Sequence, residues 1–163
     1  MNKTISALIL AAVAVALPLS AVAGALEKPA EAALQRALED EYHAEAFYDA
    51  VMAKFGEVRP FVNIIEAERR HASMLADVMK TYGLDIPKNR QIGSAEMKAA
   101  VPATLGEACR MGVAAEIANR DLYRKELLPA VTGHADIATV FERLSAASDN
   151  NHLPAFQRCV ARN

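Results

Sequence analysis

Two pairs of side chains in this sequence place a carboxylate three residues before a histidine: Glu68 with His71, and Asp149 with His152. An α-helix has about 3.6 residues per turn, so residues three apart lie on one face and can direct both groups at one point. Carboxylate oxygen and imidazole nitrogen are ligands for iron, manganese, zinc and copper. The spacing therefore predicts two halves of a metal site, carried on two helices.

The first pair lies on the face of its helix that should point into the core. Apolar side chains recur at spacings of three and four with Glu68 and His71, namely Phe61, Ile64, Ile65, Leu75, Val78, Met79 and Tyr82. A buried ionisable side chain is costly unless it is paired or bound to a cation. Other helices must therefore supply its partners.

Two further helices carry single inward carboxylates. Glu41 and Tyr48 are seven residues apart, as are Glu116 and Tyr123, and each such helix precedes one with the carboxylate–histidine pair. This order indicates two copies of one helix pair. Glu45 lies one turn beyond Glu41 on the same face, so the spacing allows either to be the ligand. The tyrosines lie too far along their helices to bind the same ion and are predicted to be hydrogen-bond donors near the ligands or core residues.

A competing interpretation needs no metal. Both histidines could be hydrogen-bonded core residues, and Glu41 or Glu116 could form ion pairs with Arg36 or Arg120. In that case the chain is a metal-free scaffold, and removing the inward charges would leave its stability unchanged or raise it.

Four long helices are predicted to position these groups. The composition is rich in Ala, Leu and Glu, and no run alternates apolar with polar residues, which indicates an all-α protein. Proline and glycine positions predict helices over residues 29–55, 59–83, 104–128 and from 136 through His152. The first two form an antiparallel hairpin, and residues 84–103 form a longer crossover with a short helical turn at 94–100. Pro129 is expected to stop the third helix, and Pro154 to kink the fourth or begin a new one.

The N-terminal segment has the pattern of a secretory signal peptide. A lysine precedes an apolar run from Ile5 to Leu17. Pro18 to Ser20 and then Ala21-Val22-Ala23 follow this run, which predicts cleavage before Gly24. Residues 24–163 then form one domain of 163 − 23 = 140 residues, exported to the periplasm or secreted, with no membrane segment left. The formal charge of −2 becomes −2 − 1 = −3 without Lys3, and no basic cluster is longer than Arg69-Arg70, so nucleic acid is not expected as a partner.

The two cysteines, Cys109 and Cys159, are too far apart in sequence for a Cys-x-x-Cys iron–sulfur motif. Cys109 lies seven residues before Glu116 and Cys159 seven after His152, about 10 Å along each helix. On adjacent antiparallel helices these offsets bring both sulfurs to one level, and exported proteins keep disulfides. We therefore predict a Cys109–Cys159 disulfide that stabilises the fold by about 3 kcal/mol; two free thiols are the alternative.

Several segments resemble a known superfamily. The segments Glu41-Tyr-His-Ala-Glu-Ala-Phe-Tyr48 and Glu68-Arg-Arg-His71 resemble ferritins and rubrerythrins. A narrower resemblance, to an exported rubrerythrin-like family of unknown function, is carried by Phe55-Gly-Glu-Val-Arg-Pro-Phe61, Glu66-Ala-Glu-Arg-Arg-His71 and Asn150-Asn-His-Leu-Pro-Ala-Phe156. The likeness covers about residues 30–160.

This resemblance implies a ferritin-like antiparallel four-helix bundle, built from two helix-pair repeats joined by a longer crossover. It implies two iron ions, with manganese or another divalent metal as substitutes, held by Glu41, Glu68, His71, Glu116, Asp149 and His152. Glu45, Tyr48 and Tyr123 are expected to surround these ligands. Asp149 departs from the family, which mostly has the longer Glu at this position, so it could bind one metal, bind through water, or leave that corner open.

The function implied is an exported diiron oxidoreductase, either peroxide-consuming or a ferroxidase, with peroxide or dioxygen as the oxidant. An external electron donor, or ferrous iron itself, must supply electrons because no iron–sulfur motif is present. The alternative is a non-catalytic bundle that binds metal or another protein. Both functional hypotheses are compatible with a homo-oligomer.

Overall fold

The structure is a computed structural model that describes residues 26–163, so the predicted signal peptide, residues 1–23, lies outside the described residues. Within residues 26–163 the regular secondary structure is helical and contains no strand, which confirms the predicted all-α class. The elements in chain order are α1 (Lys28–Phe55), α2 (Phe61–Thr81), α3 (Ala95–Ala100), α4 (Leu105–Leu122), the π-helical turn η1 (Tyr123–Leu127), α5 (Leu128–Ala130), α6 (Ala135–Ala147), the π-helical turn η2 (Ser148–His152) and α7 (Leu153–Arg162).

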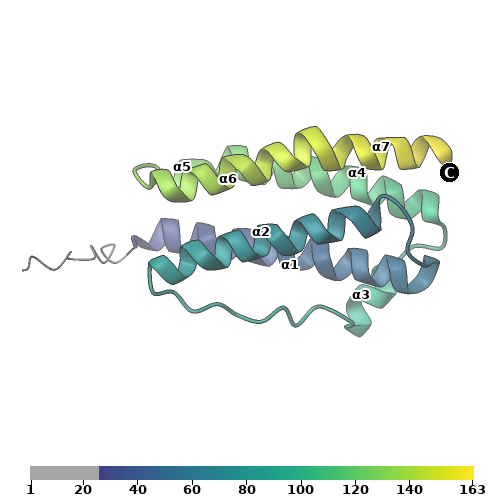
Figure 1. The fold of residues 1–163 in the computed structure, drawn as a ribbon, viewed down its shortest axis with the longest axis horizontal. Helices are drawn as coiled ribbons and strands as arrows, with labels where there is room; N and C mark the ends of the chain where they lie inside the picture. Colours follow the sequence, from purple (N-terminus) through teal and green to yellow (C-terminus); the bar gives the residue numbers. More distant parts are fainter. Residues whose placement is uncertain (1–25) are drawn as a thin grey trace, which may run out of the picture.

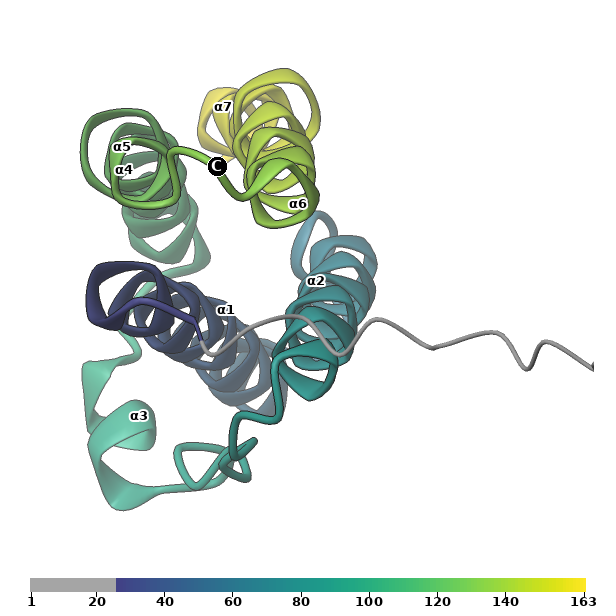
Figure 2. The same ribbon diagram turned by 90° about the vertical axis from the view of Figure 1, so that its left-hand side faces the viewer.

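These elements form four helical rods, because α4, η1 and α5 are continuous, as are α6, η2 and α7. The rods run side by side along the long axis of the molecule (Figure 1). Seen end-on, α1 lies beside α2 and α4, and the α6–α7 rod lies beside α2 and the α4–α5 rod (Figure 2). Neighbouring rods run in opposite directions, so the four inward faces meet along one axis.

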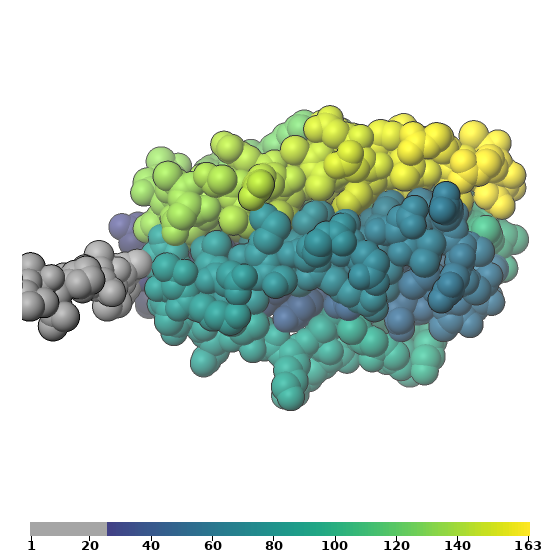
Figure 3. Space-filling model, in the orientation of Figure 1, coloured from purple at the N-terminus to yellow at the C-terminus, as the bar shows by residue number. Residues whose placement is uncertain are grey.

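The connection between α2 and α4 returns along the outside of the α1–α2 pair, which it covers along one edge of the molecule (Figure 3). Local signals define its ends. Gly83 has a φ of 70° and the Leu84 N–H donates to the Met79 carbonyl, which ends α2 as predicted. Ser94 caps α3, and a capping box between Thr104 and Glu107 begins α4. The chain thus crosses back to the opposite end of the molecule before α4 starts.

The two π-helical turns were not predicted from the sequence. Each is followed by Leu-Pro, and in each the leucine N–H donates to the carbonyl five residues earlier: Leu128 to Tyr123 and Leu153 to Ser148. Proline lacks an N–H and crowds the carbonyl four residues before it, and a wider turn accommodates it. Pro129 therefore does not stop its helix, which continues to Ala130, and α7 begins at Leu153 directly after η2, with Pro154 in its first turn.

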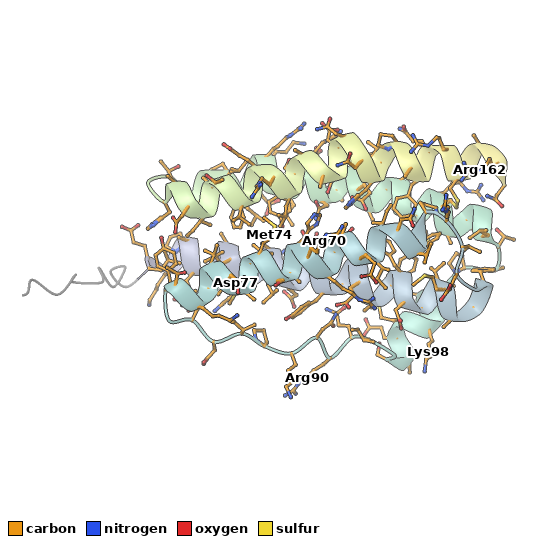
Figure 4. All side chains as sticks on the ribbon, viewed as in Figure 1. Arg70, Met74, Asp77, Arg90, Lys98 and Arg162 are labelled. Atoms are coloured by element: carbon orange, nitrogen blue, oxygen red, sulfur yellow. A yellow bond between two sulfur atoms is a disulfide. The ribbon has the colours of Figure 1, made fainter. Side chains whose placement is uncertain are left out.

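Two apolar clusters fill the interior and leave a polar zone between them. One contains Leu34, Leu38, Leu75, Met79, Phe141 and Leu144, and the other contains Val51, Phe61, Ile65 and Phe156. Along α1 the first cluster ends at Leu38 and the second begins at Ala46, with the two inward glutamates between them. Other charged side chains, such as Arg90, Lys98 and Arg162, lie on the outside (Figure 4). The interior carboxylates are therefore enclosed by apolar packing.

A disulfide joins Cys109 on α4 to Cys159 on α7, and both cysteines are fully buried. The two helices pack closely here: a Cβ at Gly112 would overlap the Phe156 ring. The α4 and α7 rods are thus held together covalently and by side-chain packing at this end.

Replacing both cysteines with alanine is expected to lower the free energy of unfolding by about 4 kcal/mol, because the 50-residue loop that the disulfide closes would no longer be constrained in the unfolded chain. Equilibrium urea unfolding of the oxidised protein and of the double variant measures this difference. An unchanged midpoint and slope would show that the disulfide contributes nothing.

Candidate metal centre

The structure brings five of the six predicted ligands together in the polar zone. They come from all four rods: Glu41 from α1, Glu68 and His71 from α2, Glu116 from α4 and His152 from η2. They form two groups of three, Glu41 with Glu68 and His71, and Glu68 with Glu116 and His152. Within each group the potential ligand atoms all lie within 4.8 Å of one another. Glu68 belongs to both groups.

The two oxygens of the Glu68 carboxylate face different histidines. Oε2 lies 3.0 Å from Nδ1 of His71, and Oε1 lies 3.2 Å from Nδ1 of His152. The imidazole rings stack with their centroids 5.6 Å apart. One carboxylate therefore lies between two nitrogen ligands, an arrangement that can bridge two ions.

Each histidine also faces a carboxylate of its own. His71 Nδ1 lies 3.2 Å from Glu41 Oε2, and His152 Nδ1 lies 3.4 Å from Glu116 Oε2. The two halves of the site thus have the same composition. Each contains one histidine, one carboxylate that faces only that histidine, and one oxygen of the Glu68 carboxylate. Arg36 and Arg120 pair elsewhere, so the ion pairs with Glu41 and Glu116 considered in the metal-free interpretation are not formed.

The two tyrosines hold these outer carboxylates in a crossed arrangement. Tyr48 on α1 donates to Glu116 Oε1 at 2.8 Å, and Tyr123 at the start of η1 donates to Glu41 Oε1 at 2.8 Å. Burial raises the pKa of both phenols well above 10, so each remains a donor at neutral pH. Each tyrosine therefore leaves the other carboxylate oxygen free to face its histidine.

Glu45 is not part of this cluster. Its carboxylate pairs with Arg69 at 2.9 Å and accepts a hydrogen bond from the Asn89 side chain at 3.1 Å. Of the two candidates on α1, Glu41 is therefore the one that lies in the cluster of candidate ligands. Glu45 instead ties α1 to α2 and to the crossover, so its predicted place around the ligands is not seen.

Asp149 also lies outside the cluster. Its carboxylate pairs with Arg124 at 2.8 Å and Arg120 at 3.4 Å on the α4–η1 rod. Asp149 and His152 lie in the π-helical turn η2, where residues three apart diverge around the axis more than in an α-helix. His152 therefore points inward while Asp149 points toward solvent, and the predicted ligand role of Asp149 is not supported by its position.

Proton positions in the metal-free site follow from burial and these contacts. Burial raises the pKa of Glu41 to about 8, against the opposing effect of His71. Burial lowers the pKa of the histidines, but the carboxylates that they face outweigh it and raise the pKa of His71 to about 9 and of His152 to about 10. Burial raises the pKa of Glu68, but both histidines outweigh it and lower the value to about 2. Without metal, protons occupy the positions that cations would take.

One buried nitrogen atom in the site lacks a hydrogen bond. His152 Nδ1 is buried and makes no hydrogen bond of acceptable geometry to any residue between 26 and 163. Buried polar atoms are nearly always satisfied, and exceptions need a physical reason. Two carboxylate oxygens lie within 3.4 Å of this nitrogen. A cation placed among the three atoms would satisfy all of them, so the donor set fits a metal ion.

A cavity of about 290 Å³ reaches the site from the side of α1 and α4. Tyr48, Glu68 and Glu116 line its buried end, and Met111, Ala115 and Ala118 line its exposed end. Spacing along single helices could not predict this cavity, because its walls come from different rods. It connects one half of the site with the protein surface.

Comparison with protein-family models, curated proteins and solved structures finds no match to this chain. Among the described residues, no helix is both long and apolar enough to cross a membrane.

Proposed function

We propose that the chain is an exported ferritin-like protein that binds two metal ions, and that it acts as a diiron oxidoreductase of the peroxide-consuming or ferroxidase type. The observation that carries this proposal is the Glu68 carboxylate, whose two oxygens face His71 and His152 separately. A single buried ion pair needs only one partner. A carboxylate between two histidines, each with a second carboxylate, matches the requirements of two cations.

The crossed tyrosine contacts support a four-helix bundle made of two repeated helix pairs. Tyr48 and Glu41 on α1 exchange partners with Tyr123 and Glu116 on the α4–η1 rod, over equal distances of 2.8 Å. Each of these rods is followed in sequence by the rod that carries one histidine. Such internal symmetry is expected if one helix pair was duplicated.

The number of ligands favours catalysis over a purely structural role. Each ion would have three protein ligands, whereas structural sites are usually closed by four. Three carboxylates and two neutral imidazoles form a mixed oxygen and nitrogen environment that suits iron or manganese. The apolar clusters on both sides limit the access of water to the remaining positions.

When bound, two ferrous ions supply two electrons, which with two protons convert hydrogen peroxide into two molecules of water and leave the iron ferric. The residues of this chain hold the ligands in place: Tyr48 and Tyr123 orient the outer carboxylates, and Glu68 keeps both histidines directed inward. No Cys-x-x-Cys motif is present to return electrons, so a separate donor must do so, or ferrous iron is the substrate. The buried disulfide supports export, because disulfides persist in oxidising compartments.

Mixing the ferrous-loaded protein with hydrogen peroxide in a stopped-flow instrument is expected to oxidise the iron at least about tenfold faster than free ferrous iron. A Glu116→Gln variant should lose most of this acceleration, because it weakens one of the two positions. A Glu66→Gln variant is the matched control, since Glu66 is exposed on α2 outside the cluster. Oxidation no faster than that of free iron would leave a metal-binding protein without this catalytic function.

A further inference from the structure

The cavity between α1 and α4 is larger than hydrogen peroxide or dioxygen requires. Its volume is about 290 Å³. A cavity of ~150 Å³ is sufficient to hold benzene in a protein core. Its size therefore corresponds to a small organic molecule, such as one with a substituted aromatic ring or a branched alkyl group.

The walls of the cavity expose mostly apolar surface, although Asp40, His43, Asn119 and Ser148 also line it. Ala44 and Phe47 on α1 face Met111, Ala115 and Ala118 on α4 across it. The α4 residues are exposed to solvent at the opening, and Met111 is 40% exposed. Removing an apolar group from water into such a space is favourable. The body of a ligand in this cavity is therefore expected to be apolar.

The buried end of the cavity is polar and contains two carboxylates. Tyr48, Glu68 and Glu116 line it, and each is at most 3% exposed. The Tyr48 hydroxyl already donates to Glu116, so the floor offers carboxylate lone pairs as acceptors. A ligand that reaches the floor should carry an O–H donor, and a carboxylate, which has no donor at neutral pH, should bind more weakly. Apolar walls with an acceptor floor suit a neutral molecule with one hydroxyl or hydroperoxyl group.

We propose that this cavity binds small neutral organic molecules through such a head group, and that the site acts on organic hydroperoxides. The second part rests on the proposed function. Two ferrous ions held by these ligands would supply the two electrons that, with two protons from solvent, break the O–O bond of the hydroperoxide and give one alcohol and one water. Both the substrate and the alcohol product carry the O–H group that the floor accepts.

Binding is tested without iron, on the whole chain kept metal-free by a chelator. Fluorine NMR titration at neutral pH should show saturable binding of 4-fluorophenol in the millimolar range or tighter. The probe 4-fluorobenzoate has the same ring but a negative charge, and it should bind at least about tenfold more weakly. Absence of saturable 4-fluorophenol binding, or equal binding of both probes, would overturn the proposal.

Two neighbouring alanines provide a matched pair of variants. Ala115 lines the cavity, while Ala114 is also exposed on α4 but does not line it. Ala115→Phe should weaken 4-fluorophenol binding at least about tenfold, because the ring fills the opening, and Ala114→Phe should leave it within about twofold. Helical circular dichroism verifies that both variants fold. Unchanged binding in Ala115→Phe would show that the probe binds elsewhere.

The ferrous-loaded protein then tests the substrate class. Ala115→Phe should slow oxidation by tert-butyl hydroperoxide more than oxidation by hydrogen peroxide, so that the ratio of the two rates falls at least about tenfold. An unchanged ratio would contradict entry through this cavity. If the probe binds as expected but neither peroxide reacts faster than with free iron, the cavity remains a ligand site and the proposed redox function is wrong.

Discussion

Replacing Glu68 with alanine is expected to abolish the binding of both metal ions, rather than of one. Glu68 is the only residue that belongs to both three-residue groups among the described residues. Its loss leaves each position with one histidine and one carboxylate, and removes the negative charge between them. Elemental analysis after anaerobic loading with ferrous iron and desalting should give about two ions per chain for the unaltered protein and almost none for the variant.

Two other variants make this result specific. Glu116→Ala removes a residue that belongs to one group, so it should retain about one ion per chain. Glu45→Ala removes an inward glutamate of α1 that pairs with Arg69 instead, and should retain both ions. If Glu68→Ala binds as much metal as the unaltered protein, the carboxylates are structural. If Glu45→Ala loses metal and Glu41→Ala does not, the ligand on α1 has been assigned incorrectly.

The metal-free protein is expected to lose stability as the pH rises from about 6.5 to 10, whereas added metal should become more stabilising over the same interval. In the folded chain the pKa values of His71 and His152 are raised to about 9 and about 10 from 6.5. Their contribution to stability is fully present below pH 6.5 and is lost as the pH rises through the folded values.

The two glutamates with large pKa shifts affect stability in other pH ranges. Glu41 has its pKa raised from 4.5 to about 8, so its contribution is present below pH 4.5 and is lost as the pH rises toward 8. Glu68 has its pKa lowered from 4.5 to about 2, so its contribution is present above pH 4.5 and is lost only as the pH falls toward 2. For each proton that the folded chain binds and the unfolded chain does not, the free energy of unfolding falls by about 1.4 kcal/mol for every unit by which the pH rises. The metal-free protein should therefore be most stable near pH 4.5, and should lose stability more steeply above about pH 6.5, where the histidines add to the effect of Glu41.

Metal binding must displace the protons on Glu41, His71 and His152, so its affinity should rise with pH. Thermal unfolding in a chelator and in excess Mn²⁺, measured from pH 6 to about 9, tests both trends. The Tm in chelator should fall, and the difference between the two Tm values should widen. A Tm in chelator that is constant or rises over this range would contradict the proton assignment.

The helices and most of the ligand set could be predicted from the sequence, because both depend on regular spacing. Glu41, Glu68 and Glu116 interrupt apolar stripes of ordinary α-helices, where the period of about 3.6 residues determines which side chains share a face. The disulfide followed from the same reasoning, because equal offsets from the ligands place Cys109 and Cys159 at one level. Gly83, Ser94 and Thr104 contact backbone groups only a few residues away in the sequence, so their positions at helix ends could also be predicted.

Only the tertiary structure separated residues that the helical period makes equivalent. Glu41 and Glu45 share one face of α1, and they are distinguished by their surroundings: Glu41 lies opposite His71, while Arg69 and Asn89 engage Glu45. The crossed pairing of the tyrosines and the cavity likewise depend on which rods are neighbours, which spacing along one helix does not specify.

Asp149 shows the other limit of reasoning from an ideal helix. Its spacing from His152 predicted a common face, but the π-helical turn before Pro154 rotates the two residues apart. The sequence by itself determined the helices, their inward faces and four of the five clustered candidate ligands, because these follow from local backbone periodicity, and it left Glu41 and Glu45 equivalent. The tertiary structure alone decided how each carboxylate is paired, because a buried charge is stabilised by whichever opposite charge or donor the neighbouring rod brings within a few ångströms.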